Sequence, residues 1–121
     1  MSTPKATIAD VATLRNAIEQ GDEATLVGLY ADDAEIRVVD HTRPPSKPTL
    51  VTGKPAIAEF YHDLCGRAMT HKVEQTIASQ NGIAYTEACQ YPDGVRVLSS
   101  NLLELRDGKI ALHSLVQAWD E

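Results

Sequence analysis

The stretch KVEQTIASQNGIAYTEACQYPDGVRVLSSNLLELRDGKIALHSLVQAW, residues 72–119, decides the fold of this chain. Turn residues interrupt it at Asn81-Gly82, Pro92-Asp93-Gly94 and Asp107-Gly108. Asparagine or aspartate followed by glycine is the strongest short-range signal for a tight hairpin. The segments between these turns alternate apolar and polar residues, as strands do. We therefore predict an antiparallel β-meander with strands at 72–79, 83–91, 95–106 and 109–119.

The residues at the beginning of the chain have the periodicity of a helix. From Ile8 to Ile18, apolar residues recur three or four positions apart and form one stripe. Thr7 and Asp10 have the spacing of a capping box at the start of this helix. Gly21 suits the left-handed position that follows a helix end. We therefore predict a first helix that is capped at Thr7 and ends before Gly21.

The segment between this helix and the meander mixes short elements with a long loop. Asp22 can cap a second helix, which we expect to end at the turn sequence Ala31-Asp32-Asp33-Ala34. A third helix is predicted to begin at Gly53-Lys54-Pro55, because proline is favoured in the first turn of a helix, and to end at Gly66. The other predictions here are a strand at 35–39, a proline-rich loop at 41–48 and a brief strand at 50–52.

The chain has 121 residues and a net charge of −6, from 11 basic and 17 acidic side chains. This length fits one domain, 1–121, and the negative charge argues against binding to nucleic acid or to an anionic membrane. No secretory signal or membrane span is recognisable. We expect Cys65 and Cys89 to be free thiols in the reducing cytoplasm. No spacing of histidine, cysteine or carboxylate residues predicts a metal site.

Helices followed by an antiparallel meander form an α+β pattern. The helices must bury their apolar stripes against one face of the sheet. A strongly bent sheet that wraps around helices leaves a hollow at its open end, and such hollows bind small molecules.

Several motifs of this chain are informative in combination: Gly21-Asp22, Leu29-Tyr30-Ala31-Asp32-Asp33-Ala34, Gly53-Lys54-Pro55-Ala56-Ile57, Phe60-Tyr61 and Ala118-Trp119-Asp120. Together they resemble the nuclear transport factor 2-like superfamily, and within it the branch of ketosteroid isomerases and SnoaL-type polyketide cyclases. The resemblance extends from about Ile8 to Trp119. It implies a cone-shaped, cystatin-like fold in which a curved antiparallel sheet wraps around three helices. This fold hosts isomerases, cyclases, dehydratases, epoxide hydrolases and non-enzymatic binders.

The resemblance also implies positions for the site residues. Ketosteroid isomerases have a carboxylate base at the end of the first strand, and an ungapped count places that position at Val38. Asp40 is two residues further and therefore shares its strand face. The oxyanion-binding tyrosine of their first helix corresponds to Leu14, so that donor is missing. Their second oxyanion donor corresponds to Asn101, and the acid at the end of the last strand in the cyclases corresponds to Asp120.

The residues themselves suggest further site positions. One face of the last predicted strand carries His113, Gln117 and Trp119, the apolar-with-polar mixture of a ligand cavity. His113 is either a second acid–base group or a core histidine with one hydrogen bond. Tyr85 and Glu87 share a face of strand 83–91, which either lines the cavity or is exposed. The expected substrate-binding residues are Leu14, Val38, Phe60, Tyr85, Leu103, Gln117 and Trp119.

The resulting hypothesis is a cofactor-free enzyme that removes a proton next to the carbonyl group of a small apolar molecule, giving isomerisation, cyclisation or dehydration. Asp40 takes the proton if burial raises its pKa; otherwise it is a strand-end acid or a cap of the loop. Asn101, with Tyr85 or His113, stabilises the enolate oxygen. The alternative is a non-catalytic binding or assembly protein of the same fold, with the cone filled by side chains such as Leu103.

The outer face of the last strand predicts a homodimer. Ile110, Leu112, Val116 and Ala118 alternate with the cavity-facing residues and are too apolar to remain in water. A contiguous patch of this kind usually binds a partner, and packing of sheet against sheet is also what the resemblance implies.

Overall fold

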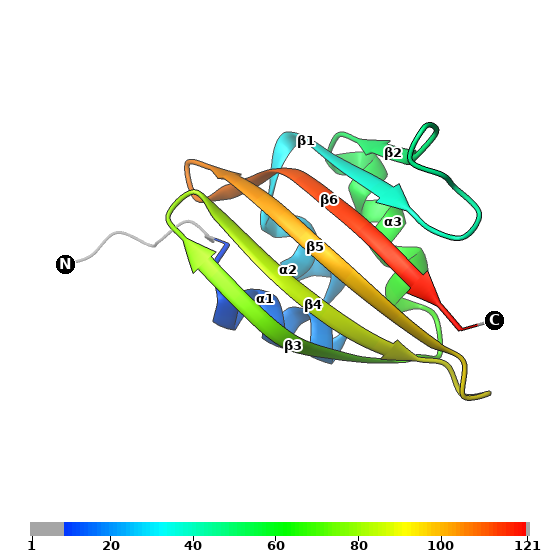
Figure 1. The fold of residues 1–121 in the computed structure, drawn as a ribbon. Coiled ribbons are helices and arrows are strands. Elements are labelled where there is room, and N and C mark those ends of the chain that lie inside the picture. The colour runs from blue at the N-terminus through cyan, green and yellow to red at the C-terminus, as the bar shows by residue number, and fades with distance from the viewer. Residues whose placement is uncertain (1–8, 121) are drawn as a thin grey trace.

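A computed structural model describes residues 9–120, which form three helices and one six-stranded sheet. In chain order the elements are α1 (Val11–Gln20), α2 (Glu23–Gly28), β1 (Tyr30–Val39), β2 (Thr49–Thr52), α3 (Lys54–Cys65), β3 (Thr70–Ser79), β4 (Gly82–Gln90), β5 (Arg96–Arg106) and β6 (Lys109–Trp119). The three helices lie behind the sheet, all on one face (Figure 1). This arrangement confirms the α+β fold with a curved sheet around helices.

The strand order in the sheet is β2-β1-β6-β5-β4-β3. Strands β3 to β6 pair antiparallel with their neighbours in the chain, as predicted for the meander. Strand β1 pairs antiparallel with β2 but parallel with β6, so the sheet is mixed. The parallel pair joins the two halves of the chain, because it places the first strand beside the last.

The first helix begins later than the capping box predicted. Asp10 is its N-cap, with a side chain that accepts a hydrogen bond from the backbone N–H of Thr13 at 2.8 Å. Thr7 and Ile8 lie outside the described residues. The helix ends at Gly21, whose φ of 67° is the left-handed conformation predicted for it.

The turn predicted at residues 31–34 is wrong, because β1 begins at Tyr30 and includes these residues. The register against β6 shifts between Tyr30 and Glu35, so this part of the strand is irregular. Tyr30 and Ala34 are buried, while Asp33 points outward and accepts a hydrogen bond from Arg106 at 2.5 Å. Burial of the apolar side chains therefore outweighs the local preference of the Asp-Asp pair for a turn.

A bulge in β6 changes which side chains face the core. Glu104 pairs with Leu112 and Leu105 pairs with Ile110, so Ala111 is the extra residue. Ile110 is fully buried, and its predicted position on the outer face is wrong because simple alternation does not account for the bulge. Leu112, Val116 and Ala118 do lie on the outer side and are partly or largely exposed.

The core lies between the inner face of the sheet and the helices. Its largest fully buried side chains are Leu29, Tyr30, Ile36, Ile57, Ile83, Leu103, Ile110 and His113. Among residues 9–120, no helix combines the length and apolar character that crossing a membrane requires.

Candidate functional site

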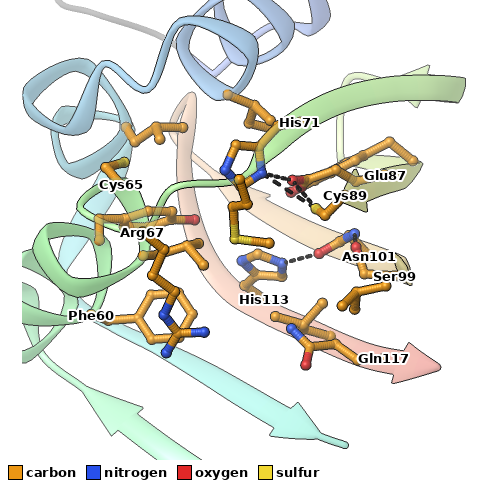
Figure 2. A pocket seen from close by; sticks show the side chains of 18 of the residues that line it. Phe60, Cys65, Arg67, His71, Glu87, Cys89, Ser99, Asn101, His113 and Gln117 are labelled. Carbon is orange, nitrogen blue, oxygen red and sulfur yellow. Dashed lines mark hydrogen bonds and ion pairs between the residues drawn. The ribbon is translucent and has the colours of Figure 1, made fainter. Parts of the chain in front are cut away.

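A cavity opens on the inner face of the sheet, at the end where β4 and β6 finish and β5 begins (Figure 2). Its free volume is about 50 Å³, which is room for only a few water molecules. Apolar and aromatic side chains form most of the wall, including Phe60 and Leu64 of α3. The polar and charged residues that line it are Arg67, His71, Glu87, Ser99, Asn101, His113 and Gln117.

A continuous chain of buried hydrogen bonds runs along the floor of this cavity. The hydroxyl oxygens of Tyr61 and Tyr30 are 2.5 Å apart, and the Tyr30 hydroxyl is 2.8 Å from Nδ1 of His113. Nε2 of His113 is 2.8 Å from Oδ1 of Asn101, whose amide nitrogen donates to the Ser99 hydroxyl at 2.9 Å. The chain connects α3, β1, β6 and β5, so it positions all these residues relative to one another.

The protonation state of His113 sets the direction of these hydrogen bonds. Burial lowers its pKa to about 3, so at neutral pH the ring is uncharged and has one donor and one acceptor nitrogen. Oδ1 of Asn101 can only accept, so Nε2–H of His113 donates to it. Nδ1 therefore accepts from Tyr30, which in turn accepts from Tyr61. Burial raises the pKa of both tyrosines, so both hydroxyls stay protonated.

A second cluster lies beside this chain, where β3 pairs with β4 and Glu87 is the register partner of Ser99. His71 of β3 is the register partner of Cys89 of β4. One carboxylate oxygen of Glu87 accepts from Nδ1 of His71 at 2.7 Å and from the Cys89 thiol at 3.0 Å. The Cys89 sulfur is itself 3.3 Å from Nδ1 of His71. Figure 2 shows the three side chains meeting at one point beside the cavity.

Cys89 is not activated as a nucleophile in this cluster. Burial raises the pKa of its thiol, and the neighbouring Glu87 carboxylate raises it further, by its charge and by the hydrogen bond it accepts. A protonated thiol is a hydrogen-bond donor and a poor nucleophile. The cluster therefore differs from a Cys-His pair, in which the cysteine is ionised.

Two uncharged donors face the cavity from neighbouring strands. The Tyr85 hydroxyl makes no hydrogen bond to another residue within 9–120, although the side chain is buried. Burial raises the pKa of Tyr85 well above its ordinary value, so the hydroxyl keeps its proton. Tyr85 is the register partner of Asn101, and the Asn101 amide has a second N–H besides the one bonded to Ser99.

The rim of the cavity is formed by Arg67, Tyr91 and Trp119. The Arg67 guanidinium donates to Asp63 at 2.7 Å and to the Tyr91 hydroxyl at 3.1 Å. The rings of Tyr91 and Trp119 stack with centroids 5.9 Å apart. The Trp119 indole N–H donates to Gln117 at 3.0 Å. The charged Arg67 side chain thus lies beside the stacked rings of Tyr91 and Trp119 at the entrance of the cavity.

Six of the predicted site residues line this cavity together: Phe60, Tyr85, Asn101, His113, Gln117 and Trp119. Leu14, Val38 and Leu103 are buried in the core but do not line the cavity. Asp120 is exposed, and its carboxylate accepts from the backbone N–H of Arg96 at 3.0 Å, so it lies outside the cavity too. The roles of the lining residues stay predictions.

Asp40 does not line the cavity. One of its oxygens accepts from both the backbone N–H and the hydroxyl of Thr42, each at 2.8 Å. Partial burial raises the pKa of Asp40, but the hydrogen bonds from Thr42 and Arg43 and the charge of His41 outweigh it and lower the pKa overall. The condition for a base at Asp40 is therefore not met, and the observed geometry is that of the alternative, a cap of the loop.

Sequence reasoning missed the roles of His71, Tyr30 and Tyr61 in this site. His71 lies in β3 and contacts Glu87. The sequence leaves open whether the face that bears Tyr85 and Glu87 lines the cavity or is exposed, and both residues line the cavity. The alternation of Tyr85, Glu87 and Cys89 along one strand is the sequence signal that these three side chains share one face.

Comparison with known proteins gives a family and a fold. The SnoaL-like domain family matches residues 11–113. A nuclear transport factor 2-like protein of unknown function from Mesorhizobium loti superposes with a TM-score of 0.76 at 19% identity, over 87% of this chain and 84% of that one. A candidate ketosteroid isomerase from Kribbella flavida gives a TM-score of 0.73 at 18% identity, over 96% and 78%.

A loop-truncation variant of the protein IdmH is also similar, with a TM-score of 0.65 at 22% identity over 88% of each chain. No curated protein sequence matches. At these identities the solved structures establish the fold alone, whereas the family match covers most of the chain. This protein belongs to the SnoaL-like domain family, and its fold is that of nuclear transport factor 2-like proteins.

Proposed function

We propose that this chain is an enzyme that moves a proton next to the carbonyl group of a small, mostly apolar molecule bound in the cavity. The observation that carries the proposal is the position of Glu87. It is the only carboxylate among the described residues that line the cavity, and its side chain is 13% exposed. A carboxylate beside apolar walls can serve as a general base for an activated C–H group.

In this mechanism Glu87 replaces Asp40 as the base. The carboxylate takes a proton from the carbon next to the carbonyl group, and the electron pair of that C–H bond moves onto the oxygen as an enolate. Glu87 then returns the proton to a different carbon, which completes an isomerisation without a cofactor. The hydrogen bonds from His71 and Cys89 orient the carboxylate between these steps.

The enolate oxygen is bound by the free N–H of Asn101 and the hydroxyl of Tyr85. Both groups are uncharged donors on neighbouring strands, and both line the cavity. Donors that are already oriented stabilise a developing oxyanion without reorganising, and each contributes about 10²–10³ in rate. His113 does not act as a cationic acid here, because its pKa of about 3 keeps it neutral. Its role is to orient Asn101.

The test is a comparison of Glu87→Gln with wild type on a panel of small enones and β-diketones. Turnover and exchange of the α-protons for deuterium are followed by NMR. Loss of the base should reduce both rates by about 10²–10⁴-fold, while Asp40→Asn, the matched control, should keep the wild-type rates. Equal rates in wild type and Glu87→Gln would exclude Glu87 as the base.

The free volume favours a second candidate function, a binding protein without catalysis. A cavity of about 50 Å³ is much smaller than the roughly 300–1,000 Å³ of typical ligand sites. A ligand would therefore have to displace side chains at the rim, such as Trp119. Binding that changes Trp119 fluorescence, with no α-proton exchange for any ligand that binds, would support this candidate over the enzyme.

We also propose that the protein is a homodimer and works in the reducing cytoplasm. Cys65 and Cys89 are both free thiols. Leu98, Leu102 and Val116 are 50%, 54% and 54% exposed on the outer face of the sheet, and covering them would remove apolar surface from water.

A further inference from the structure

We infer that His71, Glu87 and Cys89 form a binding site for one zinc ion. The three side chains supply a nitrogen, an oxygen and a sulfur that converge on one point, with separations of 2.7, 3.0 and 3.3 Å. This inference goes beyond the proposed function, because it does not depend on any substrate.

The spacing of the three atoms is close to what zinc needs. Tetrahedral zinc, with Zn–S of about 2.3 Å and Zn–N and Zn–O of about 2.0–2.1 Å, separates its ligand atoms by roughly 3.3–3.6 Å. The observed separations are roughly 0.2–0.6 Å shorter than these values. The side chains would therefore have to move apart by this amount to admit the ion in place of the shared hydrogen bonds.

The chemistry of the three groups selects zinc. A mixed set of thiolate, imidazole and carboxylate suits this borderline-soft ion better than magnesium or calcium, which prefer oxygen alone. On binding, the Zn–S bond forms as the thiol proton leaves to solvent. Two anionic ligands and one neutral imidazole then balance the 2+ charge. Such a neutral site suits side chains that are only 12% and 13% exposed, as His71 and Glu87 are.

The backbone holds these ligands in place. His71 and Cys89 are paired residues on neighbouring strands, and Glu87 is two positions from Cys89 on the same strand face. All three line the cavity, where Figure 2 shows them side by side, so an ion that they hold would be reached from the cavity. Three protein ligands with one open position is the arrangement in which zinc binds water or a small ligand.

Glu87 cannot bind zinc and act as the general base at the same time. A carboxylate that is bound to Zn²⁺ through Oε2, the oxygen that accepts from His71 and Cys89, is a much weaker base. Zinc should therefore inhibit any activity that uses Glu87 as the base, whereas binding of the metal itself can be measured without a substrate. Failure of the zinc site would leave the proposed function intact, and the reverse also holds.

The test is a titration of tag-free, reduced and chelator-treated protein with Co²⁺, followed by displacement with Zn²⁺. We expect one Co²⁺ per chain with a thiolate-to-cobalt absorption band in the near ultraviolet. Cys89→Ser should abolish the band, and His71→Ala should weaken binding by at least about tenfold. Cys65→Ser, which removes the other thiol, is the matched control and should keep the band.

A measurement on the wild-type protein alone tests the site even if the variants fail to fold. X-ray absorption of the zinc-loaded protein should show one sulfur scatterer, with nitrogen or oxygen for the remainder. A wild-type chain that gives no cobalt band, a band that survives Cys89→Ser, or a zinc shell without sulfur would each overturn the inference.

Discussion

At the scale of the residue, His113 is the side chain that links Tyr30 to Asn101 in the buried hydrogen-bond chain. It is 2% exposed and accepts from Tyr30 while donating to Asn101. In a neutral ring one nitrogen donates and the other accepts, which matches these two hydrogen bonds. The hydrogen-bond chain and the lowered pKa therefore describe the same state of this residue.

This state predicts how stability depends on pH. The pKa of His113 falls from 6.5 in the unfolded chain to about 3 in the fold, so between these values the unfolded state binds one more proton. The free energy of unfolding should fall as pH drops below 6.5, by about 1.4 kcal/mol per pH unit from this group. Above 6.5 the contribution is constant.

Urea unfolding at a series of pH values measures this effect. The His113→Gln variant removes the titrating group, so its free energy of unfolding should vary less steeply than that of wild type between pH 4.5 and 6.5. His62→Gln, which removes an exposed imidazole, is the matched control for the loss of a histidine that is not buried. Parallel profiles for wild type and His113→Gln would contradict a buried neutral histidine.

At the scale of the element, the hairpin between β3 and β4 differs from its sequence signal. Ser79 pairs with Gly82, so the two loop residues are Gln80 and Asn81 and the glycine belongs to the strand. The φ angle of Gly82 is not positive. A Cβ atom there would lie 2.9 Å from the carbonyl oxygen of Leu103, so this glycine allows the close approach of β4 and β5.

Gly82→Ala should therefore destabilise the fold by about 1–3 kcal/mol, because the contact is with backbone, which cannot rotate away. Gly28→Ala is the matched control, since a Cβ there meets nothing within 4 Å. The same substitution in a helix usually adds up to about 1 kcal/mol of stability. Denaturant midpoints for the two variants measure the difference, and equal midpoints would contradict the contact argument.

The hairpin between β5 and β6 behaves as its sequence indicates. Asp107 and Gly108 have φ angles of 52° and 76°, the positive pair typical of a tight Asp-Gly turn. Asp-Gly therefore forms the predicted loop between β5 and β6. The loop between β3 and β4 lies one residue earlier than the predicted Asn-Gly. The difference arises because Ile83 and Tyr85 must point into the core, which sets the register of β4.

At the scale of the whole molecule, the sheet has one covered and one bare face. The helices cover the inner face (Figure 1). On the outer face, Ile77, Leu98, Leu102 and Val116 of β3, β5 and β6 are between 50% and 77% exposed. We name these four residues the outer apolar patch.

The outer apolar patch predicts a dimer in solution. Light scattering should give twice the chain mass at micromolar concentration, and Leu102→Glu should give a monomer, because burying an unpaired carboxylate is costly. Leu50→Glu is the matched control: Leu50 is 57% exposed, but it lies on β2 at the other edge of the sheet. A monomer mass for wild type would refute the dimer.

Periodicity and turn chemistry were sufficient for the helices and the meander, but not for the start of β1, where a turn was predicted. The helical stripe before Gly21 and the dipeptides of the meander are local signals, because both arise from residues within a few positions of each other. Alternation also identified the face that bears Tyr85 and Glu87, although not whether that face was covered. The bulge at Ala111 escaped this reasoning, since pairing with β5 creates it.

The sequence by itself determined the helices, the meander and the α+β class, because local preferences and apolar spacing act along the chain. Only the tertiary structure decided which groups meet. Pairing of β3 with β4 brings His71 to Glu87 and Cys89, and packing of β1 beside β6 brings Tyr30 to His113. These contacts join residues 16 and 83 positions apart, and no short-range pattern encodes them because strand pairing and burial of the core set their register.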